Sequence, residues 1–223
     1  MVVYDIVCLL VAGCPQNALD LVFVLDSSGS IRDSNPTDGS FDNWALLLQF
    51  VINIIQQLPI GEDFFRVGVV RFSNSGDSIF YLSSYLDDKP SMIEAVSNMR
   101  YIGSDTNTAS GLREMIMGQF LESRGDRRFV NNLAIVITDG VSTVDKALTI
   151  PTAIDAQERG INMFTVGITS AIDEEEIRLM SSQPQIEGET FWRITDFTQL
   201  DNIVDSVVNQ ACQVPSGKFS CFH

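Results

Sequence analysis

Five oxygen-bearing side chains, widely separated along the chain, have the clearest chemical meaning. Asp26, Ser28 and Ser30 alternate directly after an apolar run, Thr106 lies far downstream, and Asp139 follows a second apolar run. Carboxylates and hydroxyls are the ligands that hard cations such as Mg²⁺ prefer, and Mg²⁺ takes about six of them. Because two carboxylates cannot fill that shell, the set predicts a cation that accepts a ligand from outside. These residue types also suit a helix cap, a turn and a strand end without metal.

The composition argues against several other chemistries. The chain has 223 residues, with 14 Lys and Arg against 29 Asp and Glu, and its single histidine is the last residue, His223. The acidic balance disfavours nonspecific nucleic-acid binding, which needs an excess of basic side chains. Histidine, the usual proton carrier and zinc ligand, is therefore missing from the body of the chain, and the sequence has no glycine-rich phosphate loop. We therefore expect a binding protein rather than an enzyme.

Short apolar runs predict the strands that must position the oxygen set. Four runs rich in β-branched residues are nearly continuously apolar, as strands buried on both faces of a parallel sheet are. Two weaker runs are expected as edge strands. The four strong strands are 19–26, 66–72, 133–138 and 162–167, and the two weak ones are 78–81 and 190–194.

Amphipathic stretches between these runs predict helices. Alternating β and α units indicate one α/β domain with a doubly wound, Rossmann-like sheet and helices on both faces. Ligand sites in such sheets lie beyond the carboxyl ends of the strands, where Asp26 and Asp139 are expected. The predicted helices are 43–58, 91–99, 109–121, 147–159, 174–181 and 198–211.

The spaced oxygen set resembles the metal-ion-dependent adhesion site of the von Willebrand factor type A family, in its secreted extracellular-matrix form. The resemblance covers roughly residues 17–212 and implies a six-stranded, mostly parallel sheet with one antiparallel edge strand. It also implies that the two serines bind the cation directly, and that the other three ligands bind it directly or through water. The residues that carry it are Asp26, Ser28, Ser30, Thr106 and Thr138-Asp139-Gly140.

The resemblance also implies what this site binds. In the family, a Glu or Asp of a partner protein completes the shell of the cation. The expected ligand is therefore an extracellular protein, either a matrix protein such as collagen or a receptor. A cation held by only two carboxylates is under-neutralised and attracts an acidic side chain. Mg²⁺ is the first choice of cation, with Mn²⁺ and Ca²⁺ as alternatives.

One segment departs from the family pattern. The family enters its first helix soon after the second serine, whereas residues 31–42 intervene here and carry proline, glycine and aspartate, which are typical of loops. We expect a loop at the rim of the site, where it would influence the choice of partner. A second cation held by Asp33, Asp38 and Asp42 is the alternative to a solvated loop.

The start of the chain indicates export. The apolar run 6–12 is too short to cross a membrane but fits the apolar core of a secretory signal. We expect a signal peptide over 1–13, a type A domain over 14–212 and a short tail over 213–223.

The cysteines extend this prediction. Secreted members of the resembled family often close the domain with a disulfide, which predicts a Cys14–Cys212 bridge. Cys221 is then left over, and an odd exported cysteine favours a disulfide-linked oligomer.

Arg124, Gly125 and Asp126 resemble the integrin-recognition tripeptide. They fall in a charged segment between a predicted helix and the 133–138 strand, on the side of the sheet opposite the metal site. A solvated loop and a second adhesive motif both fit this position.

Together these observations predict a secreted adhesion or extracellular-matrix module that binds a protein ligand through a divalent cation. The alternative is a structural matrix protein assembled by disulfide-linked polymerisation, in which the metal site is secondary. An intracellular scaffold is disfavoured by the apolar leader and the cysteines.

Overall fold

Six strands form one mixed sheet in the order β3-β2-β1-β4-β5-β6 in the computed structural model, which describes residues 18–215. Neighbouring strands are parallel except β2 and β3, which pair antiparallel at one edge. This arrangement confirms the predicted fold class. The strands are β1 (Leu19–Asp26), β2 (Phe65–Phe72), β3 (Gly76–Phe80), β4 (Asn131–Thr138), β5 (Ile161–Ile168) and β6 (Phe191–Ile194).

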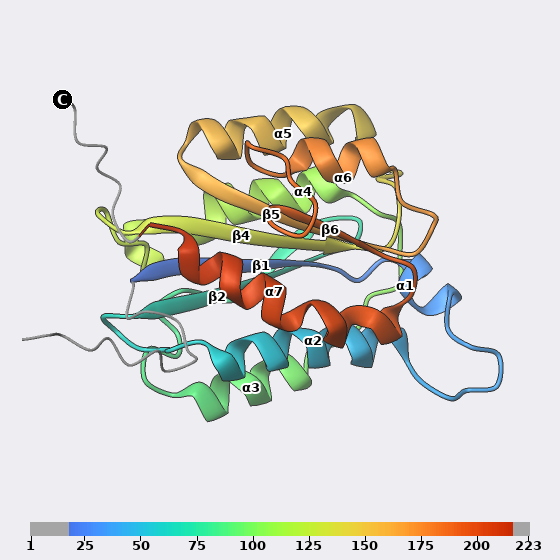
Figure 1. The fold of residues 1–223 in the computed structure, drawn as a ribbon, viewed down its shortest axis with the longest axis horizontal. Coiled ribbons are helices and arrows are strands. Elements are labelled where there is room, and N and C mark those ends of the chain that lie inside the picture. Colours follow the sequence, from blue (N-terminus) through green and yellow to red (C-terminus); the bar gives the residue numbers. More distant parts are fainter. Residues whose placement is uncertain (1–17, 216–223) are drawn as a thin grey trace, which may run out of the picture.

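Helices cover both faces of this sheet (Figure 1). Helices α2, α3 and α7 lie on one face and α4, α5 and α6 on the other, while the short α1 follows the end of β1. Within residues 18–215, no helix has the length and apolar surface needed to cross a bilayer. The helices are α1 (Gly29–Asp33), α2 (Asn43–Gln57), α3 (Lys89–Ser97), α4 (Thr108–Glu114), α5 (Lys146–Glu158), α6 (Glu174–Met180) and α7 (Leu200–Gln213), with shorter turns η1 (Met115–Gln119), η2 (Glu122–Arg124) and η3 (Phe197–Gln199).

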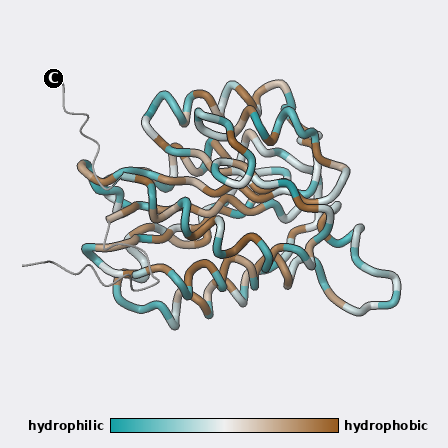
Figure 2. The backbone as a smooth tube through the Cα atoms, in the orientation of Figure 1, coloured by the Kyte–Doolittle hydropathy of each residue, from teal (hydrophilic) through white to brown (hydrophobic). Residues whose placement is uncertain are grey.

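The burial of the central strands explains their nearly continuous apolar sequence. All eight residues of β1 are buried, and successive side chains enter opposite apolar layers. Phe23 packs in the layer beneath α2 and α7, whereas Val22 and Val24 pack beneath α4 and α5. Figure 2 shows apolar strands in the interior and a polar loop that projects beyond α1. The rigid core therefore ends where the candidate metal residues begin.

The predicted helix over 109–121 changes type in its second half and ends two residues early. The α-helix ends at Glu114 and continues as the wider π-helical turn η1. At its end, the buried Gln119 amide donates to the carbonyl oxygens of Val69 (3.4 Å) and Phe80 (3.1 Å). The β2–β3 register shifts between Val69 and Val70, and buried carbonyl groups there need donors. The π-helical turn thus ends at a buried polar side chain that supplies a donor at this register shift.

The expectation of a loop over all of 31–42 is also partly wrong. Residues 31–33 belong to α1, and the loop proper begins at Ser34. The reason is Ile31, which is fully buried in the layer beneath α2 and needs a helical turn to reach it. This turn places Asp33 close to the metal residues.

Candidate metal centre

The carboxyl ends of β1 and β4 bring two acidic side chains to neighbouring positions. The strands pair in parallel with Leu25 opposite Ile137, so Asp26 and Asp139 follow at adjacent strand ends. Both residues are buried, with exposed fractions of 0% and 2%. The Thr138 hydroxyl donates to Asp26 Oδ2 at 2.6 Å, which fixes that carboxylate against β4.

Ser28 and Ser30 link the two carboxylates by hydrogen bonds. The Ser28 amide donates to Asp26 Oδ1 at 2.8 Å, and the Ser30 hydroxyl donates to Asp139 Oδ1 at 2.6 Å. The two serine hydroxyls lie 3.1 Å apart. Ser28 occupies the N-cap position of α1 in an extended conformation, and the first helical turn directs Ser30 to the same side. Four of the five predicted side chains therefore share one cluster.

Thr106 is tied to this cluster through its backbone. Its carbonyl accepts hydrogen bonds from the amides of Thr143 (2.8 Å) and Val144 (3.0 Å), and its amide donates to the Thr143 hydroxyl at 3.1 Å. Residues 143 and 144 belong to the loop that follows Asp139. The loops that carry Thr106 and Asp139 are thus held together, although no hydrogen bond among the described residues joins the Thr106 hydroxyl to the other four side chains.

The two carboxylates are poorly compensated by the protein. Burial, and then the negative charge of Asp26, raise the pKa of Asp139 to about 7, although the Ser30 hydroxyl opposes this shift. Burial also raises the pKa of Asp26, against hydrogen bonds from Ser28 and Thr138. In the part of the chain that the structure describes, no Lys or Arg forms an ion pair with either group. A divalent cation would supply the missing positive charge.

The donor set fits a hard cation. Every side-chain atom of the cluster that could bind a metal is a carboxylate or hydroxyl oxygen, the type of ligand that Mg²⁺ and Ca²⁺ take. Across residues 18–215, no three acidic, histidine or cysteine side chains come together as metal ligands. A metal centre here therefore depends on the serine hydroxyls, and a cation with about six ligands keeps positions for water or an outside group.

An open recess of about 420 Å³ lies beside this cluster. It reaches two of the candidate ligands, so a side chain of another molecule can approach them. Its lining residues are Ser30, Asp33, Ser34, Asp139, Thr169, Ser170 and Ala171.

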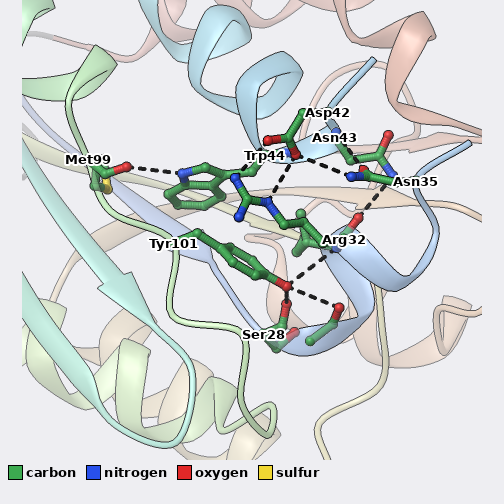
Figure 3. A network of polar contacts seen from close by, with 10 residues as sticks. Ser28, Arg32, Asn35, Asp42, Asn43, Trp44, Met99 and Tyr101 are labelled. Atoms are coloured by element: carbon green, nitrogen blue, oxygen red, sulfur yellow. Dashed lines mark hydrogen bonds and ion pairs between the residues drawn. The ribbon is translucent and has the colours of Figure 1, made fainter. Parts of the chain in front are cut away.

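The structure adds Tyr101, which the sequence analysis did not single out. Its hydroxyl lies 2.6 Å from the Ser28 carbonyl oxygen and 3.1 Å from that of Gly29 (Figure 3). Its ring lies 4.5 Å from the Arg32 guanidinium and 5.7 Å from the Trp44 ring. Tyr101 thus fixes the backbone of the serine loop from the segment that leads to Thr106. No local pattern could have revealed it, because 73 positions separate Tyr101 from Ser28.

We expect Tyr101→Phe to weaken Mg²⁺ binding about 3- to 10-fold, because one neutral hydrogen bond contributes about 0.5–1.5 kcal/mol. The ring contacts remain, but the lost hydrogen bond also stabilises the metal-free fold, so the midpoint of thermal unfolding without metal should fall by about 1–6 °C. Isothermal calorimetry and thermal unfolding measure the two effects. Tyr85→Phe is the control, since the Tyr85 ring packs on Phe80 at 5.1 Å, away from the cluster. Unchanged Mg²⁺ affinity in Tyr101→Phe would contradict the role assigned to the hydroxyl.

The alternative of a second cation at Asp33, Asp38 and Asp42 is not supported. Asp42 pairs with Arg32 at 2.7 Å and caps α2, while Asp38 accepts the Ser40 amide at 3.0 Å in the loop tip. Asp33 lines the recess instead. The three carboxylates are therefore used separately.

The tripeptide Arg124-Gly125-Asp126 lies before β4, at the end of the sheet opposite the metal cluster. Its three residues are half-buried, and the Arg124 guanidinium lies 3.8 Å from the Tyr81 ring centre. Gly125 has φ +104°, and a Cβ there would come within 2.6 Å of the Ser83 nitrogen. This packing constrains the tripeptide, and its adhesive role stays a prediction.

Cys212 is buried in the last turn of α7. Cys14, Cys221 and the predicted signal peptide lie outside the described residues. The Cys14–Cys212 bridge and the oligomer therefore stay predictions.

Comparison with known proteins decides the family. The model of the von Willebrand factor type A domain matches residues 20–206, which include the whole candidate cluster. The chain belongs to this family. A type A domain thus accounts for both the order of the strands and the position of the oxygen set at their carboxyl ends.

Curated relatives share this domain within longer proteins. Matrilin-1 of Gallus gallus is 30% identical over 92% of this chain and 38% of the relative. The collagen alpha-1(XII) chain of Notophthalmus viridescens is 30% identical over 89% of this chain and 20% of its own length. The transmembrane cell adhesion receptor mua-3 of Caenorhabditis elegans is 29% identical over 94% of this chain and 5% of its own length. This chain therefore spans well under half of each relative.

A solved structure shows the same fold. Proximal thread matrix protein 1 from the mussel byssus, with a zinc-occupied metal-ion-dependent adhesion site motif, superposes with a TM-score of 0.78 at 24% sequence identity. The match covers 91% of this chain and 47% of that chain. A divalent cation is therefore present at this motif in a protein of the same fold.

Proposed function

We propose that this domain is an adhesion module of the extracellular matrix that binds a protein ligand through a divalent cation. The observation that carries the proposal is the pair of buried carboxylates, Asp26 and Asp139, which lack a basic partner among the described residues. Asp139 also lines an open recess. A fixed, uncompensated pair of this kind is costly unless a cation neutralises it.

Each predicted ligand has a role in this proposal. The hydroxyls of Ser28 and Ser30 would bind the cation directly, and Asp26, Thr106 and Asp139 directly or through water. When bound, the cation supplies the positive charge that draws an acidic side chain of the partner. Mg²⁺ is our first candidate because it accepts an all-oxygen set and keeps exchangeable waters. The zinc in the mussel protein supports a divalent ion in general rather than a particular one.

We propose binding rather than catalysis. The cluster contains no histidine or cysteine, and its two carboxylates accept hydrogen bonds from hydroxyl and amide donors. The extracellular setting is proposed from the apolar leader, the cysteines and the relatives, which include a collagen chain and a cell adhesion receptor.

The test measures binding of the purified chain to immobilised collagen and to other matrix proteins, in MgCl₂ and in excess EDTA. We expect binding to at least one of them in MgCl₂, its loss in EDTA and its return when Mg²⁺ is restored. Binding of equal strength in EDTA would contradict the proposal.

The second candidate function is a matrix protein assembled through disulfides, for which Cys221 is the proposed link. Reducing and non-reducing gels of the secreted chain separate the two candidates. A ladder that disappears on reduction favours assembly, whereas a monomer under both conditions counts against it.

A further inference from the structure

Ser73, the residue directly after β2, bonds to the segment that carries Thr106. Ser73 is fully buried, with an exposed fraction of 0%. Its hydroxyl donates to the Asp105 carbonyl at 2.9 Å and accepts the Ser104 amide at 3.1 Å. Its carbonyl accepts the Asn107 amide at 2.8 Å. Ser73 therefore bonds to the chain on both sides of Thr106.

These bonds hold an irregular segment against a rigid strand end. β2 ends at Phe72, which is fully buried and lies opposite Asp26 in the parallel register of β1 and β2. Ser104 and Asp105, by contrast, are exposed and belong to neither a helix nor a strand. Because Ser73 follows Phe72 directly, its hydroxyl ties this segment to the part of the sheet that also fixes Asp26.

The loop that follows β4 holds Thr106 from the other side. The Thr106 carbonyl accepts the amides of Thr143 (2.8 Å) and Val144 (3.0 Å). Thr106 thus lies between two supports, one from the end of β2 and one from the loop after β4. Loss of the Ser73 hydroxyl would remove two bonds from the first support and leave the second intact.

The same segment also contacts the serine loop, because the Ser104 carbonyl accepts the Gly29 amide at 2.7 Å. The serine hydroxyls, however, are held by each other and by a carboxylate of the cluster. Among the described residues, the Thr106 hydroxyl has no such bond to the other candidate ligands, so its place depends on its backbone. Thr106 is therefore the candidate ligand that depends most on Ser73.

We propose that Ser73 is a positioning residue of the metal centre, whose hydroxyl sets the place of Thr106 relative to the cation. The inference rests on the proposed function, because it requires that Thr106 binds the cation directly or through water. Ser73 acts through Thr106 rather than as a ligand. Its single hydroxyl proton is already donated to the Asp105 carbonyl.

The test is a double-mutant cycle of Ser73→Ala and Thr106→Val. The affinity for Mn²⁺ is measured by electron paramagnetic resonance of the free ion, which also detects weak binding. We expect Ser73→Ala to weaken Mn²⁺ binding about 3- to 10-fold, as suits the loss of neutral hydrogen bonds. In Thr106→Val, which has no hydroxyl to position, the same substitution should change the affinity less than about twofold.

Ser181→Ala is the matched control for fold stability. Ser181 is also fully buried, and its hydroxyl donates to the Arg178 carbonyl at 2.8 Å at the end of α6. The Ser181→Ala substitution should lower the midpoint of thermal unfolding about as much as Ser73→Ala does. It should leave the affinity for Mn²⁺ unchanged, which separates positioning from a general loss of stability.

The outcomes separate this inference from the proposed function. Unchanged Mn²⁺ affinity in Ser73→Ala, or an equal loss with and without the Thr106 hydroxyl, would overturn the role of Ser73 and leave the proposed function standing. Absence of Mn²⁺ binding by the wild-type domain would overturn both. A loss that requires the Thr106 hydroxyl supports the inference.

Amide hydrogen exchange decides the question if Thr106→Val binds Mn²⁺ too weakly to measure. Faster exchange across residues 103–107 in Ser73→Ala than in Ser181→Ala, together with the loss of Mn²⁺ affinity, supports the positioning role. Equal exchange in the two variants would overturn it.

Discussion

Asp139→Asn is expected to abolish Mg²⁺ binding and, at the same time, to stabilise the metal-free domain. The substitution removes one of two carboxylates in the cluster but keeps an oxygen that can accept the Ser30 hydroxyl, now at 2.6 Å from Asp139. Affinity for Mg²⁺ should fall at least about 100-fold, since the ion loses half of its fixed negative charge. Stability without metal should rise, because a buried charge beside Asp26 is no longer present.

The expected gain in the stability of metal-free Asp139→Asn follows from the raised pKa of Asp139. A shift of the Asp139 pKa from 3.8 to about 7 corresponds to about 4 kcal/mol of destabilisation at about pH 8, which is an upper estimate. Thermal and urea unfolding, each with and without MgCl₂, measure both effects. Wild type should be the less stable protein without metal and should gain stability in MgCl₂, as expected for a ligand that binds only the folded state.

Asp105→Asn provides the control for this experiment. Asp105 is an exposed neighbour of Thr106 and contributes its backbone carbonyl, rather than its carboxylate, to the hydrogen bond from Ser73. The Asp105→Asn substitution should leave the stability of the domain and its stabilisation by MgCl₂ unchanged. An Asp139→Asn variant that is still stabilised by MgCl₂ as much as wild type would show that Asp139 is not a ligand.

The metal-free domain should lose stability as pH rises from about 4 to about 7. In this range the folded state holds a proton on Asp139, whereas the unfolded chain, with a pKa near 3.8, has released it. Unfolding therefore frees a proton, and a higher pH favours unfolding by up to about 1.4 kcal/mol per pH unit. Above the folded pKa both states are ionised, and this effect ends.

Other acidic residues also contribute to the dependence of the domain's stability on pH. Burial raises the pKa values of Asp20, Asp26 and Glu176, which act in the same direction. The pKa of Asp42 is lowered chiefly by Arg32 against the effect of burial, so its contribution is lost only as pH falls below about 4. The decline between pH 4 and 7 is therefore the sum of the effects of Asp139 and of these other buried acids, and the comparison with Asp139→Asn isolates the part that belongs to Asp139.

Urea unfolding across this pH range, in EDTA and in saturating MgCl₂, tests the second prediction. Mg²⁺ competes with the proton on Asp139, so its affinity should rise up to about tenfold per pH unit and level off near pH 7. Saturating MgCl₂ should then remove most of the decline. A wild-type profile in EDTA that matches that of Asp139→Asn would contradict the raised pKa.

The fold could be predicted from the sequence because its signals are local. β1 is buried on both faces, so its apolar run is continuous and ends at a polar residue where the sheet ends. The same reasoning located Asp26 and Asp139, since parallel strands place their carboxyl ends along one edge. Four predicted ligands meet there as expected, and their role as ligands stays a prediction.

The support around the cluster could not be predicted, because it depends on contacts between distant segments. Tyr101 reaches Ser28 from another loop, and Gln119, at the end of the π-helical turn, bonds to a shifted strand pair. Thr169 is β-branched, and nothing in the sequence indicates that its φ is positive. The helical turn that buries Ile31 was not predicted, because the residues that follow it are typical of a loop.

A crystal structure of the domain grown with MnCl₂, with anomalous scattering data collected for manganese, shows directly whether the cluster binds a divalent cation. We expect one strong anomalous peak within bonding distance of the Ser28 and Ser30 hydroxyls and beside Asp139, with at least one ligand position taken by water or by a neighbouring carboxylate. An ordered cluster without any anomalous peak, in crystals that contain excess Mn²⁺, would contradict the proposed metal centre.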